Sequence, residues 1–574
     1  YHAATSERRR IRLKADYYYI ALRGASIKRS QRGNNSAKQS FSVILSTQAL
    51  GKSISSMNAY EALQQHIDRK SKCYFYRRPT NVKRILHDIE GLCGTFAKLG
   101  LSKGDVVTLY LPTCPQSIAA FYACSKLGLV ASFVHPRMSL PALADIVRKT
   151  GSKTLMFFDA LVDDERKLAD IAPTLLRCSV ADYQGVTKPF FALYSRLKCK
   201  RLPTTLAYAD AVCDKTPTTV VGTDNDVVCY MHSGGTSGEA KIVAISNRAM
   251  NYVATTIGKL HCQESTRGKY ALVTLRVVQA YGLCASVHAP LLFGFGLALV
   301  PKFSAKSVHA YLSKLNVGLW MVVPAMLRKL LKADSLADKG LANVKDLWCG
   351  GDAVDESLMD EVNAVLKQCG SSAVLLRGYG LTETCGAVVV SSQAHYRKKS
   401  CGLPIDGTRI EVVDDNERVL PPNTVGELVV YSPALMTSYV GGGENWSADG
   451  GVKTGDIGYI DNDGYVYIVD RKKRSVKIAS VNVFPAEVER CICTLPQVSE
   501  CCVVGYLQKG KQYLKAYVTL ANDVAIDLPT LTALVRKICL ANLSPYSVPE
   551  CVEILAEMPL TTMCKADYRK LEGR

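Results

Sequence analysis

Ten consecutive residues, His232 to Lys241, combine glycines, hydroxyl side chains and a lysine in a pattern suited to gripping a polyphosphate. Glycines let backbone N–H groups crowd around an anion, because no Cβ blocks the approach. Hydroxyl groups donate to phosphate oxygens, and Lys241 adds a mobile positive charge. The residues that would make these contacts are Ser233, Gly234, Gly235, Thr236, Ser237, Gly238 and Lys241.

The run is not a Walker A loop, in which a lysine directly follows the last glycine of G-x4-G-K-[ST]. Here Lys241 stands three residues after Gly238 and is followed by Ile242. Taken alone, a glycine cluster of this kind is better explained by a flexible Gly/Ser turn. The choice between a phosphate grip and a turn therefore depends on the rest of the chain.

Four further clusters could take part in chemistry. Gly378–Glu383 brings an aromatic ring, a hydroxyl and a carboxylate together after an apolar segment, and Lys453–Asp456 places a carboxylate at a turn. Asp470–Arg474 is a charge run, and Pro559–Lys565 ends on a lone lysine. Each cluster has an ordinary structural explanation by itself, such as a core tyrosine or a solvated charged face. Their joint occurrence in a fixed order is what favours function.

The composition is typical of a globular protein of more than one domain. The chain has 574 residues, with 48% hydrophobic and 21% charged side chains. The apolar region Leu283–Val300 is interrupted by His288 and Pro290, so we expect buried strand and loop rather than a membrane span. The 21 cysteines are scattered without metal-ligand spacing. With no visible secretory signal, they predict reduced thiols and a cytoplasmic location.

The net charge of +20 is unevenly distributed. Residues 1–56 hold eleven Lys/Arg and only Glu7 and Asp16 as acids, and the first methionine is Met57. We expect this extension to be disordered or to be an artefact, such as a translated upstream region. The alternatives are a targeting peptide and a nucleic-acid-binding arm. A mild basic bias over the remaining chain suits polyanionic substrates such as nucleotides, and no nucleic-acid partner is expected.

From Met57 onwards, apolar spacing predicts alternating helices and strands. Helices are expected over 81–99, 115–127 and 140–149, and strands over 105–111, 130–134 and 154–158. The alternation resumes near 320–323, 346–348 and 373–376, which indicates parallel sheets with helical crossovers. From about Gly402, short strands with Gly/Asn/Asp turns take over. The last hundred residues suggest a small α+β domain.

These ordered motifs resemble the adenylate-forming superfamily, and acyl-CoA synthetases above all, over about Met57–Leu571. The resemblance rests on the clusters above together with Tyr281–Leu283, Gly350–Ala353 and Gly426–Leu428. It implies an α/β fold: a large N-terminal domain of parallel and mixed sheets flanked by helices, with a β-rich subdomain, and a small α+β C-terminal domain joined by a hinge. The expected bounds are 1–56 for the extension, 57–471 for the N-terminal domain and 472–574 for the mobile C-terminal domain.

The resemblance also implies a reaction and residue roles. A carboxylic acid attacks the α-phosphorus of ATP to give an acyl-adenylate, and the thiol of coenzyme A then displaces AMP. Tyr379 is expected to stack on adenine, Thr382 to contact the α-phosphate and Glu383 to bind Mg²⁺. Asp456 is expected to accept from the ribose hydroxyls with Arg471 nearby. Lys565 is expected to bridge the carboxylate and the α-phosphate.

The C-terminal domain is expected to rotate between the two steps about Lys473. The sequence departs from the family pattern at Ala240, Gln279, Ser480 and Cys564, where proline, histidine, glycine and glycine are usual. Ala240 belongs to the phosphate loop and Gln279 to the acyl entrance. Ser480 lies in the segment that helps line the thiol site, and Cys564 directly precedes Lys565 and affects how far that lysine can reach. Because every charged catalytic position is present, an active enzyme is expected.

Two alternatives to acyl-CoA synthesis stay open: loading the acid onto a carrier-protein phosphopantetheine, and a non-catalytic relative that binds acyl groups or nucleotides. The partners expected are a small carboxylic acid, ATP and coenzyme A, with peripheral membrane contact for a lipid acid. Leu275–Leu283 is expected to line the acid pocket. Its mixed apolar character favours a fatty or aryl acid over an amino acid.

Overall fold

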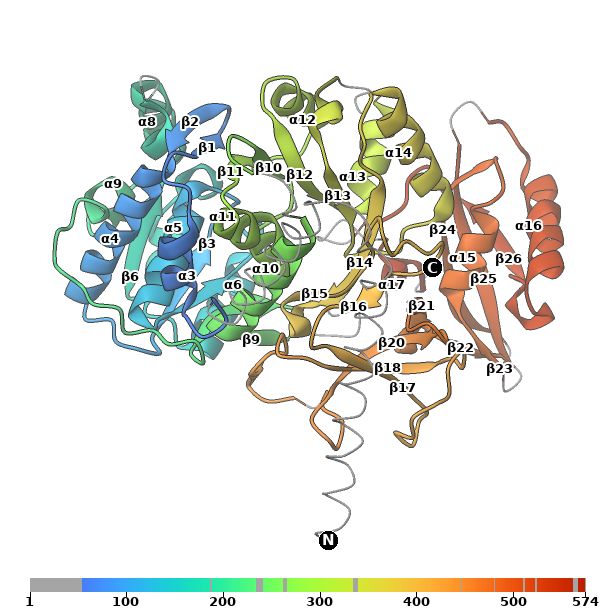
Figure 1. Cartoon of the computed structure of the whole chain (residues 1–574). Coiled ribbons are helices and arrows are strands. Elements are labelled where there is room, and N and C mark those ends of the chain that lie inside the picture. Colours follow the sequence, from blue (N-terminus) through green and yellow to red (C-terminus); the bar gives the residue numbers. More distant parts are fainter. Residues whose placement is uncertain are drawn as a thin grey trace, which may run out of the picture. The chain divides into compact units, whose positions relative to one another are not determined.

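The computed structural model describes residues 54–185, 188–233, 241–261, 266–333, 339–443, 445–478, 481–508, 511–521, 524–560 and 566–572. They belong to one compact unit, Ile54–Arg574, and Figure 1 labels many of its elements. The basic extension falls outside these residues, apart from its last three positions. The first of these, Ile54, is fully buried, and its carbonyl accepts a hydrogen bond from Asn251 Nδ2 at 3.0 Å.

The first sheet is built mainly from parallel strands, as the alternation of helices and strands predicts. Its strands in spatial order are β19 (Ser438–Val440), β9 (Ile242–Ser246), β8 (Val227–His232), β4 (Val130–Phe133), β3 (Val106–Tyr110), β5 (Thr154–Phe158), β6 (Thr174–Cys178) and β7 (Leu206–Ala207). β9 runs antiparallel to β8 and β19. The associated helices are α3 (Ala59–His66), α4 (Val82–Lys98), α5 (Pro115–Leu127), α6 (Leu140–Thr150), α7 (Arg166–Ala169), α8 (Lys188–Lys198) and α9 (Tyr208–Ala211).

Local sequence signals account for where these helices begin and end. Asn81 caps α4 by accepting from Lys83 N at 2.8 Å. Pro115 opens α5, and Gly128 ends it in the left-handed conformation with φ 68°, where glycine carries no Cβ penalty. The expected helices and strands between residues 81 and 158 are confirmed to within two residues at each end.

The second sheet is parallel through its middle and antiparallel at both edges. Its order is β16 (Leu403–Pro404), β15 (Gly386–Val390), β14 (Leu375–Leu381), β13 (Asp346–Cys349), β12 (Val317–Val322), β10 (Tyr270–Val273), β11 (Gly296–Leu299), β1 (Lys72–Phe75) and β2 (Arg78–Asn81). Its helices include α10 (Asn247–His261), α12 (Ala305–Leu312), α13 (Pro324–Lys332) and α14 (Glu356–Gln368). Trp320 of β12 is fully buried in a core to which α12, α13 and α14 contribute.

The β-rich subdomain and the small C-terminal domain follow in the predicted order. The subdomain is an antiparallel sheet of β17 (Arg409–Val413), β18 (Gly426–Tyr431), β20 (Val452–Ile460) and β21 (Val466–Arg471). The C-terminal elements are β22 (Val476–Ile478), β23 (Val481–Val483), α15 (Pro485–Ile492), β24 (Val498–Gln508), β25 (Lys511–Leu520), α16 (Leu528–Asn542), β26 (Cys551–Ile554) and α17 (Tyr568–Glu572). The mixed α/β class, with a large N-terminal and a small C-terminal domain, is confirmed.

One local expectation is wrong. The apolar run from Leu283 to Val300 is mostly helical: a π-helix, η4 (Tyr281–His288), continues into α11 (Ala289–Leu292), and only β11 is a strand. Continuous burial removes the polar face that would reveal a helical period, so a buried helix and a buried strand look alike in sequence. Within the described residues, no helix is long and apolar enough to cross a membrane.

Candidate active site

The glycine-rich run joins two antiparallel strands. β8 ends at His232 and β9 begins at Ile242, and these two residues are register partners. Ser233 N donates to Lys241 O at 2.9 Å and closes the base of the loop. The predicted contacts of Gly234, Gly235, Thr236, Ser237 and Gly238 lie outside the described residues. The loop thus begins and ends on neighbouring strands, which fixes Ser233 and Lys241 side by side.

Lys241 is linked to Glu383 through two side chains that the motifs do not contain. Its Nζ donates to Asn445 Oδ1 at 3.2 Å and lies 4.3 Å from the centre of the Tyr439 ring. Asn445 Nδ2 donates to the Tyr439 hydroxyl at 3.1 Å, and this hydroxyl donates to Glu383 Oε1 at 3.0 Å. The predicted phosphate-binding lysine and the predicted magnesium-binding carboxylate therefore share one hydrogen-bonded network.

Tyr439 is well placed to orient Glu383 because it is 5% exposed and held by its strand. Burial and the nearby charge of Glu383 raise the pKa of Tyr439 well above its usual value, so the hydroxyl remains a donor. Tyr439 lies on β19, opposite Val243 of β9. About two hundred residues separate Tyr439 from Lys241, and no local pattern marks it, so sequence reasoning missed both Tyr439 and Asn445.

Thr382 and Glu383 follow directly on β14, in the short helix η6 (Thr382–Thr384). The turn requires glycine at Gly380, where a Cβ would lie 1.4 Å from the carbonyl oxygen of Gly386. The Thr384 hydroxyl accepts from Leu381 N at 3.0 Å and tightens the turn. The Glu383 carbonyl accepts from Met436 N at 2.8 Å. Backbone geometry thus positions both side chains at the end of a buried strand.

A hydrogen bond joins Tyr379, on β14 of the second sheet, to Asp456, on β20 of the β-rich subdomain. The Tyr379 hydroxyl donates to Asp456 Oδ2 at 2.7 Å. Burial, and then the charge of Asp456, raise the pKa of Tyr379 well above its usual value. The ring that is expected to stack on adenine is therefore fixed at its far end by the carboxylate that is expected to bind ribose. The sequence predicts both residues but not the bond between them.

Asp456 also pairs with Arg471. The two residues are register partners on β20 and β21, and Arg471 Nε lies 2.6 Å from Asp456 Oδ1. Asp456 is 3% exposed, and its own N–H donates to the Thr454 hydroxyl at 3.0 Å. The structure brings Tyr379, Asp456 and Arg471 into one cluster.

The basic run after Arg471 divides between the two predicted domains. Lys472 Nζ contacts Asp415 and Glu427 of the β-rich subdomain, both at 2.9 Å. Arg474 pairs most closely with the C-terminal elements: its Nη2 lies 2.5 Å from Glu489 Oε1 on α15 and 3.3 Å from the carbonyl oxygen of Val503 on β24, and its Nη1 lies 3.9 Å from Asp470 Oδ1. Lys473, the predicted hinge, is the middle residue of the short helix η7 (Lys472–Arg474). The change of partner therefore falls at this residue.

Lys565 lies outside the described residues, and the structure describes its flanks. Leu560 and Ala566 form an antiparallel bridge, and Asp567 N donates to Pro559 O at 2.7 Å. The tyrosine of the Tyr281–Leu283 motif donates its hydroxyl to Trp348 O at 3.2 Å. A Cβ on Gly350 would lie 3.8 Å from the Tyr281 ring. The predicted acid-pocket motif and the Gly350–Ala353 motif are thus neighbours.

A metal at Glu383 would have to share its coordination with the substrate. Within the described residues, no group of three or more His, Cys, Asp or Glu side chains could hold a metal ion. A single carboxylate fits Mg²⁺, which usually takes one or two protein carboxylates and completes its shell with substrate phosphates and water. The donor set therefore suits Mg²⁺ that arrives with a nucleotide.

Comparisons with known proteins show which family the chain belongs to. The AMP-binding enzyme family matches residues 81–440, and the AMP-binding enzyme C-terminal domain matches residues 487–565. A long-chain-fatty-acid–CoA ligase of Bacillus subtilis is 26% identical over 88% of this chain and 91% of its own length. A fatty acid–[acyl-carrier-protein] ligase, ScoC, of Streptomyces coeruleorubidus is 27% identical over 83% and 88%.

A solved structure shares the fold. The anthranilate CoA ligase AuaEII, in complex with anthranoyl-AMP, superimposes with a TM-score of 0.76 at 19% identity, over 90% of this chain and 97% of its own. The family match covers more than half of the chain and contains most of the predicted site. The chain belongs to the AMP-binding enzyme family of adenylate-forming enzymes, and its class is that of AMP-forming acid–thiol ligases.

Proposed function

We propose that this protein activates a fatty acid with ATP and then transfers the acyl group to coenzyme A. In the first step a carboxylate oxygen attacks the α-phosphorus, the bond to the β-phosphate oxygen breaks, and pyrophosphate leaves. In the second step the thiol sulfur attacks the acyl carbonyl, the thiol proton is released, and AMP leaves. The observation that carries this proposal is the joining of Lys241 to Glu383 and of Tyr379 to Asp456 and Arg471.

Within this proposal the two clusters serve opposite ends of ATP. Tyr379, Asp456 and Arg471 bind the nucleoside, with the ring on adenine and the carboxylate on ribose. Ser233 and Lys241, with the glycines between them, hold the β- and γ-phosphates as pyrophosphate forms. Magnesium bound at Glu383 would neutralise phosphate charge.

Thr382 and Lys565 act at the reacting centre. Thr382 contacts the α-phosphate from the end of β14. Lys565 bridges the carboxylate and the α-phosphate, where a cation offsets repulsion and stabilises developing charge. A turn about Lys473 then withdraws Lys565 and admits the thiol.

The identity of the acid rests on composition and on relatives. Leu275 and Val277, just before Tyr281, are 2% and 1% exposed, which provides an apolar wall beside the predicted entrance. The Bacillus and Streptomyces relatives both act, by their names, on fatty acids. The Streptomyces relative transfers to an acyl-carrier protein, so carrier-protein phosphopantetheine is the second candidate acceptor. A cytoplasmic location is proposed from the free thiols.

The test separates the two half-reactions. Lys565→Ala should lower the rate of adenylate formation, measured as pyrophosphate release, by roughly 10²–10³-fold. Thioester formation from supplied acyl-adenylate should be spared. Equal loss in both steps would contradict the role of Lys565. Pyrophosphate release across acids of graded chain length, with coenzyme A or a loaded carrier protein as acceptor, then identifies the substrates.

A further inference from the structure

Helix α8 presents an apolar stripe to solvent, outside the ATP site. Phe190, Leu193 and Leu197 are 69%, 58% and 80% exposed. Their spacing of three and four residues places them on one face of the helix. Exposed leucines are ordinary when scattered singly, whereas an aligned row of large side chains marks a contact surface.

The buried side of α8 fixes the direction of this stripe. Ser195 is 4% exposed and donates its hydroxyl to Asp159, which lies in the short helix η1 (Asp159–Leu161). Arg201 NH2 donates to Ser195 Oγ at 3.2 Å. At 100° per residue, the stripe is centred about 165° from Ser195 around the helix. The anchored face and the apolar face are therefore opposite each other, and the stripe is held outward.

The segment that carries the stripe is basic. Arg196 lies about 90° from the stripe around the helix, and Lys188 and Arg201 lie on the side of Ser195. From Tyr183 to Ala209 the chain contains no Asp or Glu, and its basic residues are Lys188, Arg196, Lys198, Lys200 and Arg201. Partial burial, with the charges of Arg177 and Arg196, lowers the pKa of Arg201 against the opposite effect of Asp159 and Glu165. An apolar stripe within a basic surface is complementary to anionic lipid, which offers acyl chains below a layer of negative charge.

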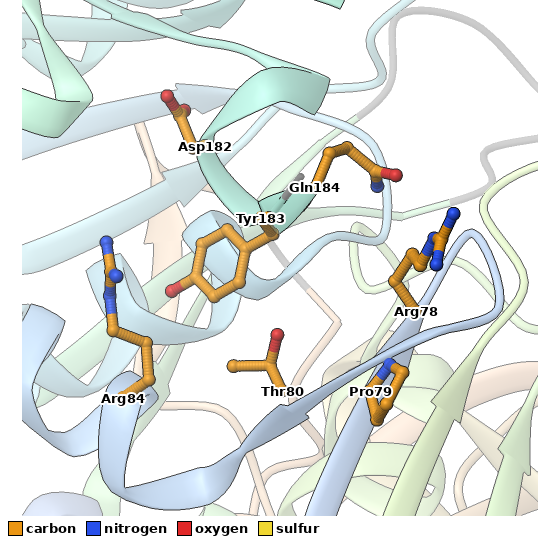
Figure 2. Close-up of a pocket in the computed structure, with 8 residues that line it drawn as sticks. Arg78, Pro79, Thr80, Arg84, Asp182, Tyr183 and Gln184 are labelled. Atoms are coloured by element: carbon orange, nitrogen blue, oxygen red, sulfur yellow. The ribbon is translucent and has the colours of Figure 1, made fainter. Parts of the chain in front are cut away.

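A pocket of about 340 Å³ adds further basic groups beside the start of α8. Its charged lining residues are Arg78 of β2, Arg84 of α4 and Asp182, and the chain leads from Asp182 through Tyr183 and Gln184 toward α8. Figure 2 shows Arg78 and Arg84 on either side of Tyr183. Arg84 is neutralised by Asp88 at 2.8 Å. Arg78, which is exposed, is the residue of this pair that extends the positive surface.

We propose that α8 docks this protein on an anionic phospholipid surface, with Phe190, Leu193 and Leu197 among the acyl chains and the flanking basic residues on the headgroups. A second copy of the chain fits this surface less well. Three side chains are few for a dimer interface, which buries about 800 Å² on each partner, and two basic faces would repel. The proposal concerns where the enzyme works and does not depend on which acid it activates.

The test is sedimentation of the full chain with vesicles of phosphatidylcholine, with or without phosphatidylserine. Wild type should bind the anionic vesicles more tightly. Combined Phe190→Ser, Leu193→Ser and Leu197→Ser should weaken that binding at least about tenfold. The matched control removes three remote exposed side chains, Val419→Ser, Leu507→Ser and Leu540→Ser, and should bind as wild type does.

A second pair of changes tests the charge. Arg196→Glu with Lys200→Glu should weaken binding to anionic vesicles by about tenfold or more, with little effect on neutral vesicles. Residues 1–56 are present in every variant, so binding through that basic extension would persist unchanged. Equal binding by wild type and the α8 variants, or no binding by wild type, overturns the proposal. The proposal is also overturned if the stripe variant changes the oligomeric state of the protein while its binding to vesicles stays the same.

Vesicle binding requires no catalytic activity, so the two proposals can fail separately. Pyrophosphate release with a water-soluble acid should be the same for wild type and the α8 variants. Absence of that activity in every form would count against the proposed function and leave the vesicle result standing.

Discussion

Tyr439→Phe isolates the hydrogen bond that connects Glu383 to the Lys241 end of the proposed phosphate site. The change removes the hydroxyl that donates to Glu383 Oε1 at 3.0 Å and keeps the ring beneath Lys241 Nζ. A hydrogen bond to a charged group contributes about 1.5–3 kcal/mol. Glu383 is partly exposed, which favours the lower end of this range, so we expect kcat/KM for adenylate formation to fall about tenfold.

The assay is isotope exchange between pyrophosphate and ATP, measured over a range of Mg²⁺ concentrations. If Tyr439 acts by orienting Glu383, the variant should need more Mg²⁺ for half-maximal rate. Tyr467→Phe is the matched control, since it removes a hydroxyl that donates to another carboxylate, Asp461, at 3.2 Å. That control should leave both the rate and the Mg²⁺ requirement unchanged.

A double-mutant cycle decides whether the two residues act together. Once Glu383→Gln has removed the charge, Tyr439→Phe should cost little further rate, because coupled residues are not additive. Full additivity would refute the reasoning, as would an unchanged Mg²⁺ requirement in Tyr439→Phe.

Three further outcomes are expected. Lys473→Pro should slow thioester formation by about tenfold or more and spare adenylate formation, because proline restricts φ at the proposed hinge. Lys473→Ala is the control and should spare both steps in the same two assays. A chain starting at Met57 should be less stable to urea than one starting at Ile54 by about 1.5–3 kcal/mol, since Ile54 is fully buried; equal midpoints would contradict this. Burial lowers the pKa of His288 to about 3, so stability should fall as pH drops from 6.5 toward 3, by up to about 5 kcal/mol. In this pH range the unfolded chain binds a proton at His288 and the folded chain does not. His288→Gln should therefore remove this part of the pH dependence of the free energy of unfolding, measured by urea titration.

The sequence predicts individual elements and residues well where the signal is local. Asn81, Pro115 and Gly128 mark helix ends through capping and backbone geometry, which neighbouring residues alone determine. The motif residues Tyr379 and Asp456 are recognisable for the same reason. Such signals survive in a single sequence because each is contained within a few positions.

What the sequence did not predict depends on strand pairing between distant segments. Tyr439 reaches Glu383 because β19 adds to β9 at the edge of the first sheet, and neither strand carries a mark of its partner. The Tyr379–Asp456 bond likewise joins two different sheets. Register between distant strands is set by the packing of the whole domain, which a local motif does not contain.

The division of apolar cores explains how a rotation at Lys473 could occur without unfolding. The C-terminal core, from Val476 to Val552, is formed by residues beyond the proposed hinge, and the core around Trp320 by residues before it. Polar contacts across the boundary include Ala486 N to Asp470 Oδ2 at 2.7 Å, Arg490 to the Val469 carbonyl at 3.2 Å, Lys332 to Ser499 at 3.3 Å, and the Arg474–Asp470 ion pair at 3.9 Å. Water can replace such bonds at a net cost of about 1 kcal/mol each, whereas opening an apolar core would cost far more. A turn at one residue is therefore compatible with two intact domains.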